Sequence, residues 1–156
     1  MSTTQTSLEL RVSRVIKARR SLVFAAWTQP ELMRRWLAPG TMHVAEASAD
    51  ARVGGAYRIA MAGAGCSGPE GNAVANGTYT AVVPNERIEF TWVIGNNPAA
   101  ETLVTVDLRD VAGGTEVVIT HRGFNSAELR DRHEHGWTGC LDNLEVFAGQ
   151  SMQVPA

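Results

Sequence analysis

Histidine side chains are the clearest candidates for acid–base chemistry in this chain, which contains four of them. His121 follows Val117 and Ile119 at every second position, so we expect it to point toward the buried side of a β-sheet. An imidazole has an ordinary pKa of about 6.5, which makes His121 the first candidate for a general acid or base. The alternative, which we favour, is a hydrogen-bonded core histidine.

Residue spacing argues against a metal site. His133 and His135 are two residues apart and so point to different faces of a helix, whereas zinc motifs on helices use spacings of three or four. Cys140 can share a face with His133, but two ligands do not make a site. The sequence therefore predicts no metal, and no motif indicates a cofactor.

Nucleophilic and phosphate-binding motifs are also missing. Lys17 is the single lysine and lies among arginines, which disfavours a phosphate-loop lysine or a buried Schiff-base lysine. The glycine-rich residues 63–71 lack the Gly-Lys-Ser/Thr ending of a phosphate loop, and Ser67 is not in a Gly-x-Ser-x-Gly turn. We expect this segment to be a hairpin tip that covers a cavity mouth, with no neighbouring positive charge to activate Cys66.

The carboxylates do not form an evident catalytic pair. Glu86, Glu89 and Glu101 are close to turns or on the outer phase of strands. Asp50 and Arg52 precede a glycine turn, where we expect them to tie down a loop. Arg130 and Glu134 have the spacing of an ordinary surface ion pair on a helix, and we expect them to form one.

Composition limits the class of protein. The chain has 156 residues, 44% of them hydrophobic, and a formal net charge of -2, so it can bury a core but lacks the basic excess of a nucleic-acid binder. We find no apolar run long enough to span a membrane, and the first residues lack the pattern of a signal peptide. Two cysteines give no disulfide framework. We expect one cytoplasmic domain over residues 8–150, with residues 1–7 and 151–156 as flexible tails.

The N-terminal third predicts one strand and two short helices. Residues 8–12 alternate apolar and polar side chains, as in a half-buried strand. Ser21 precedes the apolar residues 22–27 in the position of a helix cap. Pro30 suits the first turn of a second short helix, which residues 32–37 complete.

The remaining sequence predicts about six strands followed by one long helix. Alternating residues and turn motifs recur between residues 42 and 122, with one strand expected over Gly77–Val83. Turns are expected at residues 53–56, 84–87, 95–98 and at Gly113–Gly114. Asn125, with Glu128 three residues later, has capping-box spacing. Apolar residues at spacings of three and four then form one stripe from Leu129 to Phe147. Because strands joined by short turns are antiparallel, we expect an antiparallel sheet that curls around this helix.

The chain resembles the family named for the activator of the heat-shock-protein-90 ATPase, and the order of its elements resembles the helix-grip, START-like fold. The resemblance covers about residues 8–150 and depends on a series of motifs in a fixed order. These are VFAAWT at 23–28 with Pro30 and Glu31, RWLAP at 35–39, DARVGGAY at 50–57, GTY at 77–79, PNERI at 84–88, FTW at 90–92, GTE at 114–116, and HEHGW at 133–137 followed by Leu141 and Leu144.

The resemblance implies an α+β fold: a curved antiparallel sheet, two short helices and a long C-terminal helix across the concave face. Members of the wider superfamily bind lipids, hormones or polyketides between sheet and helix, and some catalyse cyclisation or dehydration. Eukaryotic co-chaperones join this domain to a separate N-terminal one, and we expect no such second domain within these 156 residues. Fold analogy alone does not settle function.

We therefore expect a cavity that binds a hydrophobic or aromatic small molecule, as typical apolar ligand sites do. The alternatives are a cyclase or dehydratase that uses His121 or a tyrosine, and a chaperone-linked interaction module; a homodimer is left open. The large side chains in question could also simply pack a core. The candidate ligand-binding residues are Trp36, Tyr57, Tyr79, Phe90, Trp92, His121, Trp137 and Leu141.

Overall fold

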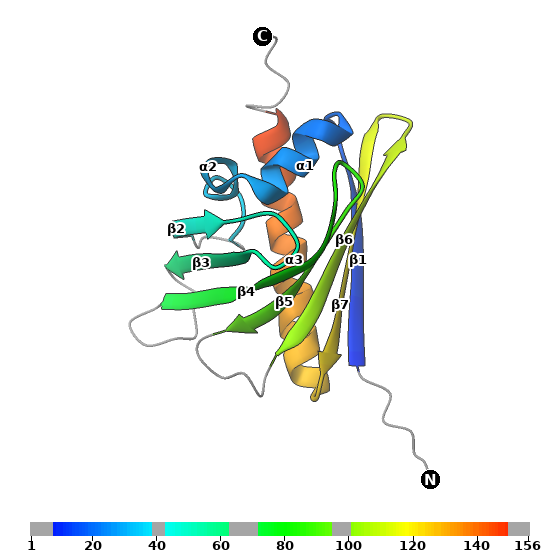
Figure 1. Cartoon of the computed structure of the whole chain (residues 1–156). Coiled ribbons are helices and arrows are strands. Elements are labelled where there is room, and N and C mark those ends of the chain that lie inside the picture. Colours follow the sequence, from blue (N-terminus) through cyan, green and yellow to red (C-terminus); the bar gives the residue numbers. More distant parts are fainter. Residues whose placement is uncertain (1–7, 39–42, 63–71, 95–100, 150–156) are drawn as a thin grey trace.

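The computed structural model describes residues 8–38, 43–62, 72–94 and 101–149 (Figure 1). Seven strands and three helices follow one another along the chain. They are β1 (Leu8–Ile16), α1 (Arg20–Thr28), α2 (Pro30–Met33), β2 (His43–Ala49), β3 (Ala56–Ala62), β4 (Asn72–Val83), β5 (Arg87–Ile94), β6 (Thr102–Val111), β7 (Gly114–Phe124) and α3 (Ala127–Phe147).

The seven strands form one antiparallel sheet in the order β1-β7-β6-β5-β4-β3-β2. Strands β2 to β7 are consecutive neighbours, and β1 joins the sheet beside β7. Figure 1 shows the sheet strongly twisted, because β2–β4 run across the view while β1, β6 and β7 run along it. Twist of this kind gives the sheet a concave face that a helix can fill. The α+β architecture expected from the sequence is confirmed.

Helix α3 lies against the concave face of the sheet and packs most closely on β1 and β7 (Figure 1). The helix buries one stripe of side chains, as its spacing predicts: Trp137, Cys140, Leu141, Leu144 and Phe147. Arg14 of β1 bonds both Asp142, at 2.8 Å, and Glu145 on α3. The β1–β7 half of the sheet therefore holds the helix firmly.

Both predicted helix caps are wrong by one or two residues. The N-cap of α3 is Ser126, not Asn125, and the Ser126 hydroxyl accepts a hydrogen bond from the Leu129 amide at 3.0 Å. The N-cap of α1 is Arg19, so Ser21 lies inside the first turn. Arg19 makes no side-chain cap bond; the burial of Val23, Ala26 and Trp27 therefore stabilises α1 in place of a polar cap.

Two strand predictions also need correction. β4 begins at Asn72, five residues before the predicted start at Gly77. The β6–β7 turn consists of Ala112 and Gly113, because Val111 pairs with Gly114. Gly113 has φ +91°, which glycine adopts without strain, so the positive-φ position rather than the Gly-Gly pair marks the turn.

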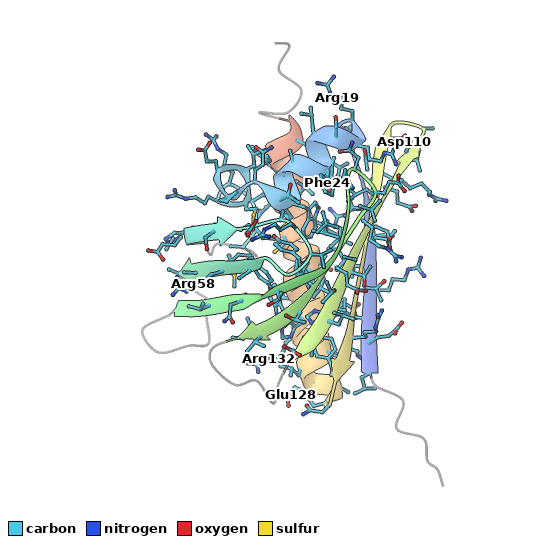
Figure 2. All side chains as sticks on the ribbon, viewed as in Figure 1. Arg19, Phe24, Arg58, Asp110, Glu128 and Arg132 are labelled. Atoms are coloured by element: carbon cyan, nitrogen blue, oxygen red, sulfur yellow. The ribbon has the colours of Figure 1, made fainter. Side chains whose placement is uncertain are left out.

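Charged side chains gather away from the core. Figure 2 labels Arg19 and Asp110 at the end of the molecule where α1 approaches the β6–β7 hairpin, and Arg20 contacts Asp110 there at 3.5 Å. Arg58 of β3 is exposed and contacts Glu46 on β2 at 2.9 Å.

No helix in the described ranges is long and apolar enough to cross a membrane. The predicted lid at 63–71, with Ser67 and Cys66, and the predicted turn at 95–98 lie outside the described residues.

Candidate functional site

A small cavity lies between the concave face of the sheet, the two short helices and α3. Its volume is about 10 Å³, which is room for about one water molecule. Within the described ranges, no charged side chain and no histidine lines it. The lining residues are Trp27, Met33, Leu37, Tyr57, Ile59, Tyr79, Phe90, Trp92 and Trp137.

Aromatic rings from three neighbouring strands form the sheet side of this cavity. Tyr57 of β3, Tyr79 of β4 and Phe90 of β5 contact one another with ring centroids 5.2–6.0 Å apart. Trp92 continues the row on β5, and its ring centroid lies 5.1 Å from that of Trp137 on α3. These rings span the gap between the sheet and the helix where the backbones are far apart.

A glycine in β4 allows Tyr57 to reach across the sheet. Tyr57 pairs with Gly77 on β4, and its hydroxyl donates a hydrogen bond at 2.6 Å to the Thr91 carbonyl on β5. A Cβ on Gly77 would lie 2.0 Å from that carbonyl oxygen, so only glycine fits. Next to it, the Thr78 amide donates a hydrogen bond to the Thr91 hydroxyl at 2.9 Å, while the Thr91 carbonyl accepts the bond from Tyr57. Burial raises the pKa of the Tyr57 hydroxyl, which stays protonated and fixed.

Trp27 forms the helical side of the cavity. Its side chain is 2% exposed and packs edge-on against Trp36, with centroids 4.7 Å apart, and against Trp137 at 6.0 Å. The Trp27 indole nitrogen is buried and has no hydrogen-bond partner among the described residues. A buried N–H group without a partner costs about 1–3 kcal/mol, which makes this one unusual.

His121 is held by hydrogen bonds on both ring nitrogens. Trp137 donates its indole N–H to Nδ1 at 3.0 Å, which places the ring proton on Nε2. Nε2 then donates to the Thr102 hydroxyl at 2.6 Å, and Thr102 in turn donates to the Trp92 carbonyl at 3.3 Å. Burial, with His133 nearby, lowers the pKa of His121 to about 2.

His133 on α3 is bonded in the same way. Trp92 donates its indole N–H to His133 Nε2 at 3.2 Å, and His133 Nδ1 donates to the Leu129 carbonyl at 3.0 Å. Burial lowers its pKa, and the Arg132 charge acts in the same direction. One tryptophan of the sheet thus bonds a histidine of the helix, and one tryptophan of the helix bonds a histidine of the sheet.

These hydrogen bonds define the chemistry of the site. Neither histidine has a free ring nitrogen, so neither is available for proton transfer in this arrangement. Burial, with the nearby Asp50 charge, raises the pKa of Tyr79 to about 12. Burial alone raises that of Cys140, which lies outside the lining, to about 12. The cavity therefore offers apolar contact and neutral hydrogen-bond groups.

The predicted site residues divide into two groups. Tyr57, Tyr79, Phe90, Trp92 and Trp137 line the cavity together. Trp36, His121 and Leu141 are buried but are not among its lining residues. The Trp36 indole donates to the Ala26 carbonyl at 2.9 Å and so connects the segment after α2 to α1.

Four lining residues were not among the candidates: Trp27, Met33, Leu37 and Ile59. Trp27 was predicted as part of an apolar helix, but helix phase alone does not show that its N–H lacks a partner. The sequence places His133 in the helical stripe and makes it a poor metal ligand, but it does not predict the bond to Trp92, a residue 41 positions away. Ile59 had a sequence signal, because it alternates with Tyr57 on β3.

The charged residues play structural roles. Arg52 contacts Asp50 at 2.8 Å beside the β2–β3 turn, as expected. Arg130 contacts Asp131 at 3.1 Å rather than the predicted Glu134, because its guanidinium turns toward the neighbouring carboxylate. Within the described part of the chain, no three His, Cys, Asp or Glu side chains gather as a metal site would require.

Comparisons with known proteins agree with this fold. The model of the activator of Hsp90 ATPase homolog 1-like protein family matches residues 17–149. A protein from Chromobacterium violaceum is similar in structure, with 27% identity and a TM-score of 0.74 over 90% of this chain and 96% of that one. The AHSA1 protein from Silicibacter pomeroyi gives 24% identity and a TM-score of 0.78 over 91% and 98% of the two chains.

One further structure comes from the dynemicin biosynthetic locus. It is 19% identical, with a TM-score of 0.73, and the match covers 92% of this chain and 48% of that one. At this identity the likeness shows the fold alone. A comparison with curated protein sequences gave no match.

Proposed function

This chain belongs to the activator of Hsp90 ATPase homolog 1-like family, and we propose that it binds a small apolar or aromatic molecule in the cavity between the sheet and α3. The observation that carries the proposal is the lining of that cavity. Aromatic rings of β3, β4 and β5 face Trp27 of α1 and Trp137 of α3 across an uncharged space. Such a lining suits apolar burial and ring stacking, which are the main sources of affinity for aromatic ligands.

Binding is proposed without catalysis. In the part of the chain that the structure describes, no histidine and no carboxylate lines the cavity, and His121 uses both ring nitrogens in hydrogen bonds to Trp137 and Thr102. A cyclase or dehydratase would need a group that exchanges protons at the ligand. The described lining supplies only tyrosine hydroxyls, and the pKa of each is raised by burial.

A ligand larger than water must displace side chains, and the α2 side is the easiest to move. The four residues of α2 bury only Met33, whereas α3 buries five side chains against the sheet. Burying one such side chain is worth about 1.5–3 kcal/mol, so moving α3 costs several times as much. Methionine is also unbranched and adapts its shape easily. We therefore assign Met33 to the adaptable part of the lining.

A blocking substitution tests this proposal. Leu37 lines the cavity, so the larger ring in Leu37→Phe should fill the remaining space and weaken binding of the neutral fluorescent probe N-phenylnaphthylamine by about tenfold or more. Fluorescence titration measures the affinity, and circular dichroism confirms the fold.

Leu10→Phe is the matched control, since Leu10 is equally buried but lies on β1 outside the lining. This variant should bind the probe as the unaltered protein does. Equal affinities of the two variants, or no probe binding by the unaltered protein, would count against the proposal.

A further inference from the structure

The four tryptophans differ in how their indole N–H groups are used. Three of the N–H groups have a partner, whereas that of Trp27 is buried and has none among the described residues. Trp36 donates to the Ala26 carbonyl, Trp92 to His133 and Trp137 to His121. The fold thus satisfies buried indole donors elsewhere, which makes the exception at Trp27 informative.

Trp27 also lies where a ligand would be. It lines the cavity opposite the aromatic row of β3–β5, and its side chain is 2% exposed. A donor in this position gains most from an acceptor brought by a bound molecule, because bulk water does not reach it.

The charge of the surroundings restricts the acceptor. Among the described residues, no arginine or other cationic side chain lines the cavity, so a carboxylate or phosphate there would be a buried charge without a counter-charge from this lining. A neutral oxygen, such as a ketone, aldehyde or ester carbonyl, carries no such penalty. Its carbon skeleton would lie against the rings of Tyr79, Phe90 and Trp92.

We infer that the ligand is a neutral apolar or aromatic molecule with a carbonyl-type oxygen, and that Trp27 Nε1 donates a hydrogen bond to that oxygen. This inference rests on the proposed function and adds the chemical class of the ligand. It separates Trp27 from the other lining residues, which provide apolar contact.

An isosteric pair of probes tests the inference. Acetophenone and α-methylstyrene have the same shape, but the first has a carbonyl oxygen where the second has a methylene carbon. We expect the Trp27 indole signal in a proton–nitrogen correlation spectrum to move downfield with acetophenone and to stay at its free-protein, non-hydrogen-bonded position with α-methylstyrene. Spectra of Trp27→Phe and Trp36→Phe assign the signals.

Removing the donor alone should remove the preference for the ketone. Replacing Trp27 with benzothienylalanine keeps the ring shape and deletes the N–H group. The ratio of the two affinities should then change by about tenfold in favour of α-methylstyrene. Trp36→Phe is the control, since the N–H group of Trp36 already has a partner and lies outside the lining, and it should leave the ratio unchanged.

Three results would overturn the inference in distinguishable ways. Binding of both probes with a ratio that the Trp27 replacement does not change would contradict the role of Trp27 and leave the proposed function standing. The same holds for a Trp27 indole signal that is already at a hydrogen-bonded position without a probe. Failure of both probes to bind the unaltered protein would overturn the proposed function, and the inference with it.

Discussion

At the scale of single residues, buried polar side chains differ in whether their nitrogen atoms have hydrogen-bond partners. His121 has the residue type of a catalytic base, yet its two ring nitrogens are occupied by Trp137 and Thr102. Trp27 was unremarkable in the sequence, yet it carries the one unpartnered buried side-chain nitrogen or oxygen of the described residues. Residue type alone therefore favours His121 as a site residue, whereas hydrogen-bond pairing favours Trp27.

The buried His121 and the half-buried His133 predict a loss of stability in acid. Burial, and to a smaller extent His133, lowers the folded-state pKa of His121 to about 2. Burial also lowers the pKa of His133, and the Arg132 charge acts in the same direction. The unfolded chain therefore binds more protons below about pH 6.5. The free energy of unfolding should fall by about 1.4 kcal/mol per pH unit for each histidine that stays neutral in the folded state.

Urea unfolding at about pH 7 and about pH 5 measures this loss. His133→Gln keeps an acceptor for Trp92 without a titrating ring, so its loss of stability in acid should be smaller than that of the unaltered protein. His135→Gln changes an exposed residue on the same helix and should behave like the unaltered protein. An equal fall in unfolding free energy in all three proteins would show that the fold does not keep His133 neutral in acid.

At the scale of elements, α2 and α3 are attached to the sheet very differently. α3 buries five side chains and is joined to β1 by the Arg14 contacts with Asp142 and Glu145. α2 buries only Met33, although Asn143 of α3 donates to the Ala38 carbonyl just beyond it at 2.6 Å. Movement that admits a ligand is therefore expected first at Met33.

Shortening Met33 should open the cavity. Met33→Ala is expected to cost about 2–5 kcal/mol of stability and to strengthen binding of N-phenylnaphthylamine several-fold, because the probe no longer has to displace the side chain. Leu144→Ala is the matched control, since Leu144 is fully buried on α3 but does not line the cavity. Thermal unfolding and probe titration together separate the two effects. Unchanged or weaker binding in a folded Met33→Ala protein would place the entry of the ligand elsewhere.

The sequence predicts elements well and their ends less well. Alternation in β5 puts Ile88, Phe90 and Trp92 on the buried face, as observed, because period-two burial is local to the strand. The cap of α3 differs by one residue, since Asn125 and Ser126 are both good caps and tertiary packing chooses between them.

The contacts of the site could not be predicted in the same way. The bond from Trp92 to His133 requires the relative placement of β5 and α3, which local pattern does not contain. The space beside Tyr57 depends on how completely Met33 and Leu37 fill it, and this is a property of packing in three dimensions. Sequence therefore predicts which side chains face inward but not how much volume they leave.

At the scale of the whole molecule, the two halves of the sheet differ in how closely they pack against α3. β1 and β7 hold α3 closely, while β3, β4 and β5 are separated from the helix by a layer of aromatic rings that contains the cavity. The crossed bonds of Trp92 with His133 and of Trp137 with His121 join the halves at the edge of that layer. Under the proposed function, this division would let one half of the sheet stay fixed while the other adapts to a ligand.

The location of a bound probe tests the central claim most directly. Nuclear Overhauser effects between N-phenylnaphthylamine and methyl-labelled protein report which side chains lie beside the probe. The account predicts effects to the methyl groups of Met33, Leu37 and Ile59, which line the cavity. Effects confined to exposed methyl groups, such as those of Val53 and Val146, would contradict binding between the sheet and α3.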